Sequence, residues 1–173
     1  MGKIGKAPEA LLFAGLIYRK EIKDDIERML LPFGRLDIFS SELSFDDFSK
    51  YYAREMGEGL IRQWVSFERI ITPDEIVEIK LESNRIEEKV STTDRRIINI
   101  DPGYITLSNL VLASTKNYSH RIYVGKGIFE EVTLIYRKAE GFVPFEWTYP
   151  DYRTDEARKF FEKVREKLKH LKK

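Results

Sequence analysis

The apolar pattern of this chain changes its period after residue 18, and this change limits the possible folds more than any other feature. Residues 10–18 read ALLFAGLIY, a run typical of a strand that is buried on both faces or at the centre of a sheet. The next residues carry apolar side chains at helical spacing with charges between them, and Pro32 and Gly34 mark the end of that pattern. The sequence therefore predicts a strand followed directly by a helix over 22–33.

A similar succession of elements follows. Strands are expected at 35–39 and at 60–71, where LIRQWVSFERII is rich in branched and aromatic residues. The segment between them reads as a loop with one helical turn, because its aromatic residues show no sustained period. Thr72, Pro73 and Glu75 have the spacing of a capping box before a helix that runs to Val90. A short strand at 96–100 is then expected to end in a turn at 101–103, DPG.

The second half of the chain predicts one more helix, a hairpin and a final helix. Residues 105–114 carry apolar side chains on one helical face, which indicates a short buried helix. Strands at 120–124 and 128–137 flank a Gly-Lys-Gly turn, the pattern of a β-hairpin. After an extended aromatic tract, Thr154 caps a last helix with eight basic and four acidic residues. We expect its apolar stripe to dock on the protein, although the charge also suits a nucleic-acid-binding arm.

The order strand, helix, strand, strand, helix, strand predicts an α+β fold, a two-layer sandwich with a ferredoxin-like βαββαβ core. An added helix, a β-hairpin and the C-terminal helix complete the chain, which we expect to form a single domain over 1–173. The helices at 22–33 and 72–90 each have one apolar stripe, so both are expected on the same face of the sheet. A doubly wound parallel sheet is the alternative, because strand order cannot be read from one sequence.

Composition excludes several classes of site. The chain has no cysteine and two histidines, which excludes disulfides and thiolate-bound metals and argues against a zinc site. We expect no metal site, although the Asp101 carboxylate could in principle ligate magnesium. The N-terminal apolar run is too short to span a bilayer, so we expect a cytoplasmic protein without membrane association. Abundant Ile, Lys and Glu resemble the composition of thermophile proteins. The net charge of +1 gives no global attraction to nucleic acid, which is therefore not the favoured partner.

Residues 102–129 contain no acidic side chain, but they contain Lys116, His120, Arg121 and Lys126. Glycines on both sides of Lys126 leave backbone N–H groups open to an anion, and the guanidinium of Arg121 can hold a phosphate or carboxylate in a bidentate fork. These residues predict a basic patch that binds a small anionic ligand. The structural alternative is that a buried helix excludes acids here, that the hairpin lysine is solvated and that His120 is a hydrogen-bonded structural residue.

Asp101, Asp151 and Arg153 complete the candidate ligand-binding residues. Asp101 follows a predicted strand, a common place for a functional side chain, although aspartate also begins many turns. Asp151 and Arg153 lie in the aromatic tract WTYPDYR. Such a tract suits either a ligand pocket or a loop whose rings fasten it across a sheet.

No known nucleotide-binding motif accompanies these residues. The glycines at 125 and 127 open a strand instead of a helix and lack the other residues of a phosphate loop. The tripeptide TKN at 115–117 begins like the guanine-specificity motif of GTPases, but Tyr118 stands where that motif needs aspartate. Lys80 and Asn84 share one face of a predicted helix and are typical of a solvated flank. The residues therefore indicate no particular reaction or cofactor.

Six tracts together resemble the bacterial family known as domain of unknown function 4416. They are VSFE (65–68), IKLESN (79–84), NIDPGY (99–104), YSHRIYVGKGIF (118–129), EVTL (131–134) and WTYPDYR (147–153). The resemblance implies that the shared tracts include Asp101, Lys116, His120, Arg121, Asp151 and Arg153, with Asn117 in place of an expected aspartate. Members are sometimes labelled GTP-binding, which the missing motifs of this chain do not support.

Two functional hypotheses follow from these patterns. The first is a protein that binds a small anionic ligand, such as a nucleotide or another phosphate ester, at the basic patch. The alternative is a non-enzymatic interaction module that binds RNA or a protein partner through the aromatic tract and the basic C-terminal helix.

Overall fold

The computed structural model describes residues 2–91 and 95–171, and within them nine strands form one sheet. Every neighbouring pair is antiparallel, in the order β2-β4-β1-β5-β6-β8-β7 with β3 beside β4 and β9 beside β8. The strands are β1 (Ala10–Arg19), β2 (Leu36–Phe39), β3 (Leu43–Ser44), β4 (Leu60–Ile71), β5 (Ile98–Ile105), β6 (Asn109–Ser114), β7 (Ile122–Gly125), β8 (Ile128–Arg137) and β9 (Gly141–Pro144). The α+β class is confirmed, and the doubly wound parallel sheet is excluded.

The α-helices of the described residues are α1 (Ile26–Leu30), α2 (Ala53–Met56), α3 (Ile76–Val90) and α4 (Asp155–Leu171). Together with the 3₁₀ turns Lys20–Asp25 and Leu31–Phe33, α1 covers the whole predicted helix 22–33, although only Ile26–Leu30 is α-helical. Not one of these helices combines the length and the apolar character needed to cross a bilayer.

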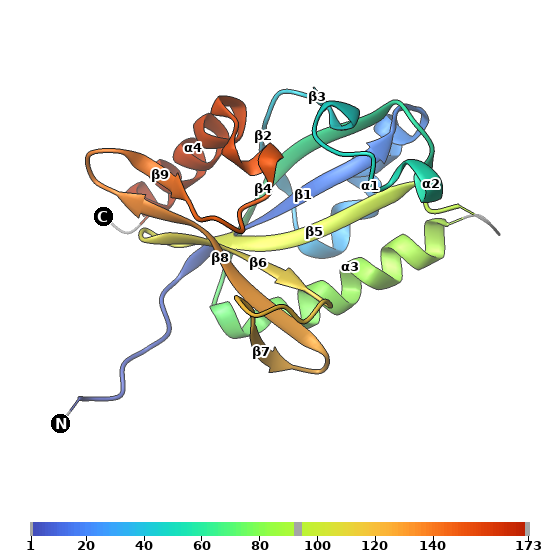
Figure 1. The fold of residues 1–173 in the computed structure, drawn as a ribbon. Coiled ribbons are helices and arrows are strands. Elements are labelled where there is room, and N and C mark those ends of the chain that lie inside the picture. The colour runs from blue at the N-terminus through green and yellow to red at the C-terminus, as the bar shows by residue number, and fades with distance from the viewer. Residues whose placement is uncertain (1, 92–94, 172–173) are drawn as a thin grey trace.

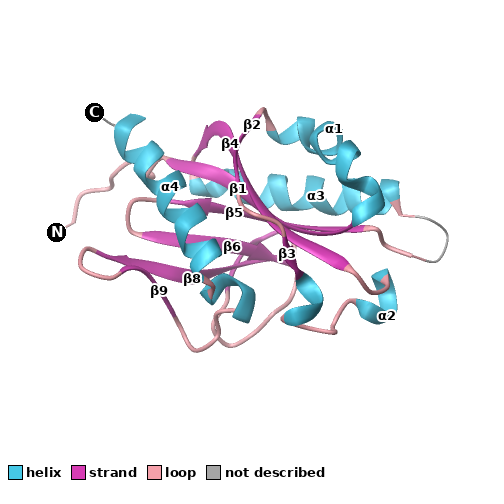
Figure 2. Cartoon of the chain, turned by 90° about the horizontal axis from the view of Figure 1, so that it is seen from above, coloured by secondary structure: helices cyan, strands magenta, loops and turns pink. Residues whose placement is uncertain are grey.

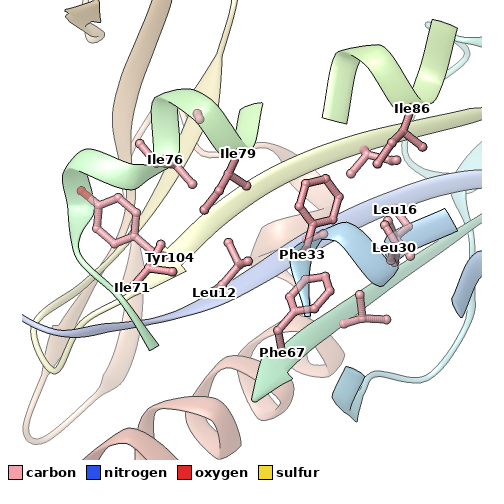
Figure 3. Close-up of a cluster of buried hydrophobic side chains, with 14 of the residues drawn as sticks. Leu12, Leu16, Leu30, Phe33, Phe67, Ile71, Ile76, Ile79, Ile86 and Tyr104 are labelled. Atoms are coloured by element: carbon pink, nitrogen blue, oxygen red, sulfur yellow. The ribbon is translucent and has the colours of Figure 1, made fainter. Parts of the chain in front are cut away.

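β1 lies between β4 and β5, as its unbroken apolar run predicted. Because successive strand residues point to opposite faces, Leu12 and Leu16 enter one core and Leu11 and Phe13 enter another. The first core also contains the apolar stripes of α1 and α3, which Figure 3 shows closing over β1. The prediction that these two helices share one face of the sheet is confirmed.

The second core lies under α4, on the opposite face of the sheet (Figure 1). Phe160, Phe161 and Val164 are buried there, so the C-terminal helix is docked as predicted. Its cap is also as predicted, because the N–H of Ala157 donates to Oγ1 of Thr154 at 3.2 Å. Figure 2 shows the sheet between helices on both faces. The expected two-layer arrangement is therefore wrong where α4 adds a third layer.

Two predicted elements are wrong. The turn expected at 101–103 is the middle of β5, which pairs with β1 through these residues. Gly103 is needed there, because a β-carbon on it would lie 2.6 Å from the ring of Phe13. The helix expected at 105–114 is the end of β5, a short connection and β6. Its apolar residues alternate between the two cores, and a run buried on both sides shows neither a helical nor a strand period.

The sheet divides between β5 and β6. These strands pair only through residues 103–105 of β5. Residues 98–102 continue beside β1, whereas the end of β6 continues beside β8, and the two strands diverge in Figure 1. Pro102, which has no N–H to donate to a neighbouring strand, stands where the pairing ends. The candidate site lies in this division.

The predicted hairpin is formed by β7 and β8, with its first strand beginning at Ile122. Gly125, Lys126 and Gly127 have φ angles of 119°, 50° and 79°. These angles lie in the left-handed region, which glycine adopts without strain. The glycines therefore shape the turn, and Lys126 stands at its tip.

Candidate functional site

A cavity of about 480 Å³ lies in the division between β5 and β6. Its volume falls within the range of small-molecule sites, roughly 300 to 1,000 Å³. Its lining comes from β1, α3, β4, β5, β6 and β8, the loop after β6, the segment 45–52 and the start of the 3₁₀ turn Pro150–Arg153. The charged lining residues are Arg62, Lys80, Glu87, Arg96, Asp101, Lys116, Arg121, Glu131 and Asp151.

Asp101 lines the cavity, and 35% of its side chain is exposed. Two neighbours hold its carboxylate. Nδ2 of Asn99 donates to Oδ2 at 2.6 Å, and Nζ of Lys80 lies 3.4 Å from Oδ1. Asn99 is itself fixed, because the Tyr52 hydroxyl donates to its Oδ1 at 3.1 Å. Asp101 is thus an oriented and accessible carboxylate.

Polar side chains of α3 hold β5 in place where it forms a wall of the cavity. Lys80 is buried and donates to the carbonyl of Ile100 at 3.0 Å, so it is not the solvated flank that its spacing indicated. Glu87 accepts the N–H of Ile100 at 2.7 Å and Nη1 of Arg96 at 2.8 Å. Burial raises the pKa of Glu87, against the lowering influence of the Lys80 ammonium.

Arg62 and Asp151 form a buried ion pair beside the cavity. Nε of Arg62 lies 2.8 Å from Oδ2 of Asp151 without the alignment of a hydrogen bond, so charge holds the pair. The guanidinium also lies 4.6 Å from the ring centroid of Trp64 and 4.9 Å from that of Tyr152. Burial alone would lower the pKa of Arg62, but the Asp151 carboxylate raises it above the ordinary value. A β-carbon on Gly15 would lie 2.6 Å from the Tyr152 hydroxyl, so only glycine leaves room for this packing.

The side chain of Arg121 is already committed to protein acceptors. Nε donates to Oε2 of Glu131 at 2.7 Å, Nη1 to Oγ of Ser114 at 2.9 Å, and Nη2 to the hydroxyl of Tyr149 at 3.0 Å. The side chains of Arg121 and Glu131 are 3% and 1% exposed. Arg121 therefore orders the loop after β6, and its charge is compensated inside the protein.

His120 does not line the cavity, but it contacts the Glu131 carboxylate of this ion pair. Its Nε2 is 3.1 Å from Oε2 of Glu131, and its ring stacks on those of Tyr118 and Trp147. The indole of Trp147 donates to the carbonyl of Val132 at 3.0 Å. The Trp147 ring thus holds its loop against the sheet, one of the two roles expected of the aromatic tract, whereas Tyr149, Asp151 and Tyr152 of the same tract line the cavity.

Lys126 and Arg153 also lie away from the cavity. Lys126 forms an exposed ion pair with Glu78 of α3. Arg153 donates to three backbone carbonyls of residues 145–148. Of the predicted site residues, the cavity brings together Asp101, Lys116, Arg121 and Asp151, and it leaves out His120, Lys126 and Arg153.

Lys116 differs from the other cations of the cavity. Within residues 2–91 and 95–171 it has no carboxylate partner. Its ammonium donates to the Tyr51 hydroxyl at 2.9 Å and lies 4.7 Å from the centroid of that ring. The hydrogen bond to Tyr51 raises the pKa of Lys116, which keeps it charged. The other four cations have a carboxylate each: Arg62 with Asp151, Lys80 with Asp101, Arg96 with Glu87, and Arg121 with Glu131.

Sequence reasoning missed one wall of the cavity. Tyr51 and Tyr52 come from a segment whose sequence shows no periodic pattern, so nothing in the sequence identified them as site residues. Asn99 and Glu131 did carry a signal, because a polar residue inside an apolar strand requires a buried partner. In the described part of the chain, no group of three acidic or histidine side chains is placed to hold a metal ion.

Comparison with known proteins gives this chain a family. Residues 8–168 match the family model described as Domain of unknown function (DUF4416), and every residue that lines the cavity lies within the match. No curated protein and no solved structure matches the chain. The match spans nearly the whole sequence, and the chain therefore belongs to the DUF4416 family.

Proposed function

We propose that this protein binds a small anionic ligand, such as a phosphate ester, in the cavity between β5 and β6. The observation that carries the proposal is the position of Lys116, a cavity cation for which the described residues provide no carboxylate. The other cations of the cavity already have their charges compensated by ion pairs, so a bound anion is attracted most strongly to Lys116. An ammonium group commonly binds phosphate as a point charge.

The tyrosines around Lys116 support the same proposal. Three exposed tyrosines line the cavity: Tyr51 (65% exposed), Tyr118 (53%) and Tyr149 (44%). A tyrosine ring offers an apolar face to a ligand and a hydroxyl at its edge. These tyrosines therefore suit a ligand in which a ring is attached to the anionic group, because the ring can lie against their apolar faces.

The test is a thermal-shift screen with nucleotides, sugar phosphates and carboxylates, followed by titration calorimetry. Lys116→Ala should weaken binding by about 10- to 100-fold, because a charged hydrogen bond contributes roughly 1.5 to 3 kcal/mol. Arg121→Ala is a poor probe, since it would leave the buried carboxylate of Glu131 without its partner.

The matched control is Lys126→Ala, which removes the same charge from an exposed site outside the cavity. Its affinity should equal that of the parent. An equal loss in both variants would indicate nonspecific attraction to a positive surface and would contradict the proposal. A parent protein that binds no compound of the screen would overturn it.

We further propose that β2, β4, β1 and β5 form a ferredoxin-like core. In support, these strands are neighbours in that order, and α1 and α3 follow β1 and β4 on one face of the sheet. The remaining strands and α4 would then be additions, and the cavity lies where the core meets them.

The alternative role as an RNA- or protein-binding module stays a prediction, as does the cytoplasmic location. Of the rings that this role would use, Tyr152 is buried against Trp64, whereas Trp147 stacks on His120 but stays exposed. The apolar stripe of α4 is likewise covered by the sheet. A titration with single-stranded RNA at two salt concentrations would test the role, since phosphate contacts make such affinity strongly salt-dependent.

A further inference from the structure

We infer that Asp101 and Asn84 form a subsite for sugar hydroxyls, so that the ligand of the cavity is a phosphorylated sugar, free or within a nucleotide. The inference rests on the proposed function for the phosphate group. The sugar is assigned to different residues, which line the same cavity as Lys116.

The carboxylate of Asp101 has acceptor capacity to spare. An ionised carboxylate has about four acceptor positions, and the protein supplies one short donor, Nδ2 of Asn99, and one long one, Nζ of Lys80. The same two partners, with Tyr52 behind Asn99, prevent the carboxylate from turning away from the cavity. A group with hydrogen-bond donors that enters the cavity therefore meets fixed and accessible acceptors.

Asn84 supplies the complementary polar group. It lies one turn after Lys80 on α3, it lines the cavity, and it is half-buried. Its side-chain amide makes no hydrogen bond with any residue that the structure describes. An amide has both donors and an acceptor, which matches a hydroxyl, since a hydroxyl also donates and accepts.

The charges around Asp101 decide which donor the subsite accepts. A ligand ammonium would be attracted to the carboxylate, but it would also meet the ammonium of Lys80, which is already 3.4 Å from Oδ1. With that charge compensated, a neutral donor is favoured over a cation. Neighbouring hydroxyls, as a sugar carries them, satisfy Asp101 and Asn84 together.

The experiment compares each sugar phosphate with its deoxy analogue by titration calorimetry on the full chain. The probes are ribose 5-phosphate, glucose 6-phosphate and adenosine 5′-phosphate, each beside its 2-deoxy or 2′-deoxy form. We expect at least one pair to differ by about tenfold in affinity, the effect of a hydrogen bond to a charged group. The adenosine pair distinguishes a nucleotide from a free sugar phosphate.

The variants separate this subsite from the phosphate site. Asp101→Asn should abolish the preference for the hydroxylated form, and Asn84→Ala should reduce it while leaving the melting temperature unchanged. Lys116→Ala should weaken both members of a pair equally and keep their ratio. Phosphate binding that depends on Lys116 but ignores the hydroxyls would overturn this inference and leave the proposed function standing. Failure of every probe to bind would overturn both.

Discussion

Arg62 and Asp151 form a buried ion pair, and both residues also line the cavity, so each has a role in the fold as well as in the site. Their side chains are 1% and 7% exposed. Asp151→Asn would leave a buried guanidinium without its carboxylate, although it preserves the side-chain shape. We expect the free energy of unfolding to fall by about 3 to 5 kcal/mol, measured by urea denaturation.

Glu78→Gln is the matched control, because it breaks an ion pair whose side chains are 62% and 61% exposed. Solvent screens such a pair, so its loss should change the free energy of unfolding by less than about 1 kcal/mol. Equal effects of the two substitutions would show that burial does not decide the contribution of Asp151.

At the scale of residues, the sequence indicated which side chains carry chemistry better than it indicated their partners. Lys116 and Asp101 were predicted as ligand-binding residues, and both line the cavity. Arg121 was predicted with them, but its charge is paired with Glu131 of β8. The sequence pattern shows that a buried arginine needs a carboxylate, yet the pairing of strands decides which one.

The capping box of the 3₁₀ turn Pro73–Glu75, which leads directly into α3, predicts a pH dependence at the scale of an element. The N–H of Thr72 and the guanidinium of Arg69 both donate to the carboxylate of Glu75. The Thr72 N–H is the main cause that holds the pKa of Glu75 below its ordinary value of 4.5. A lowered pKa in the folded state means that this stabilisation is present above pH 4.5 and is lost as pH falls through the folded pKa.

Glu75→Gln should therefore destabilise the protein at neutral pH by roughly 0.5 to 1 kcal/mol, a modest figure because the group is partly exposed. The difference from the parent should shrink as the pH falls below 4.5 and through the lowered pKa of the folded state, and urea denaturation at a series of pH values measures it. Glu68→Gln removes a nearby exposed carboxylate that has no role in the cap. If both variants showed the same pH profile, the cap would not be the source of the effect.

Elements were predictable where local chemistry decides them. Thr72 and Glu75 marked the start of α3, and glycines marked the hairpin turn. Prediction failed at 105–114, because Leu110 and Leu112 pack under α4 whereas Val111 and Ala113 pack under α3. A strand covered on both faces has no polar side, so its residues carry no period that distinguishes it from a helix.

At the scale of the whole molecule, α4 joins the cavity to the second core. It follows the turn that carries Asp151 and Tyr152. The Phe161 ring of α4 stacks on Tyr152 with centroids 5.6 Å apart and packs edge-on against Trp64 and Phe13. The apolar stripe of α4 was readable from the sequence, but the face on which it docks was not, because both faces of β1 are apolar.

Phe161→Ala tests this connection, since it removes the ring that α4 shares with β1, β4 and the turn beside the cavity. We expect the free energy of unfolding to fall by about 3 to 5 kcal/mol, the usual cost of deleting a buried aromatic ring. Lys163→Ala, on the exposed side of the same helix, should stay within about 0.5 kcal/mol of the parent. Urea denaturation of both variants measures the difference. Similar small losses would mean that the Phe161 ring contributes little to the second core and does not connect α4 to the turn that carries Asp151.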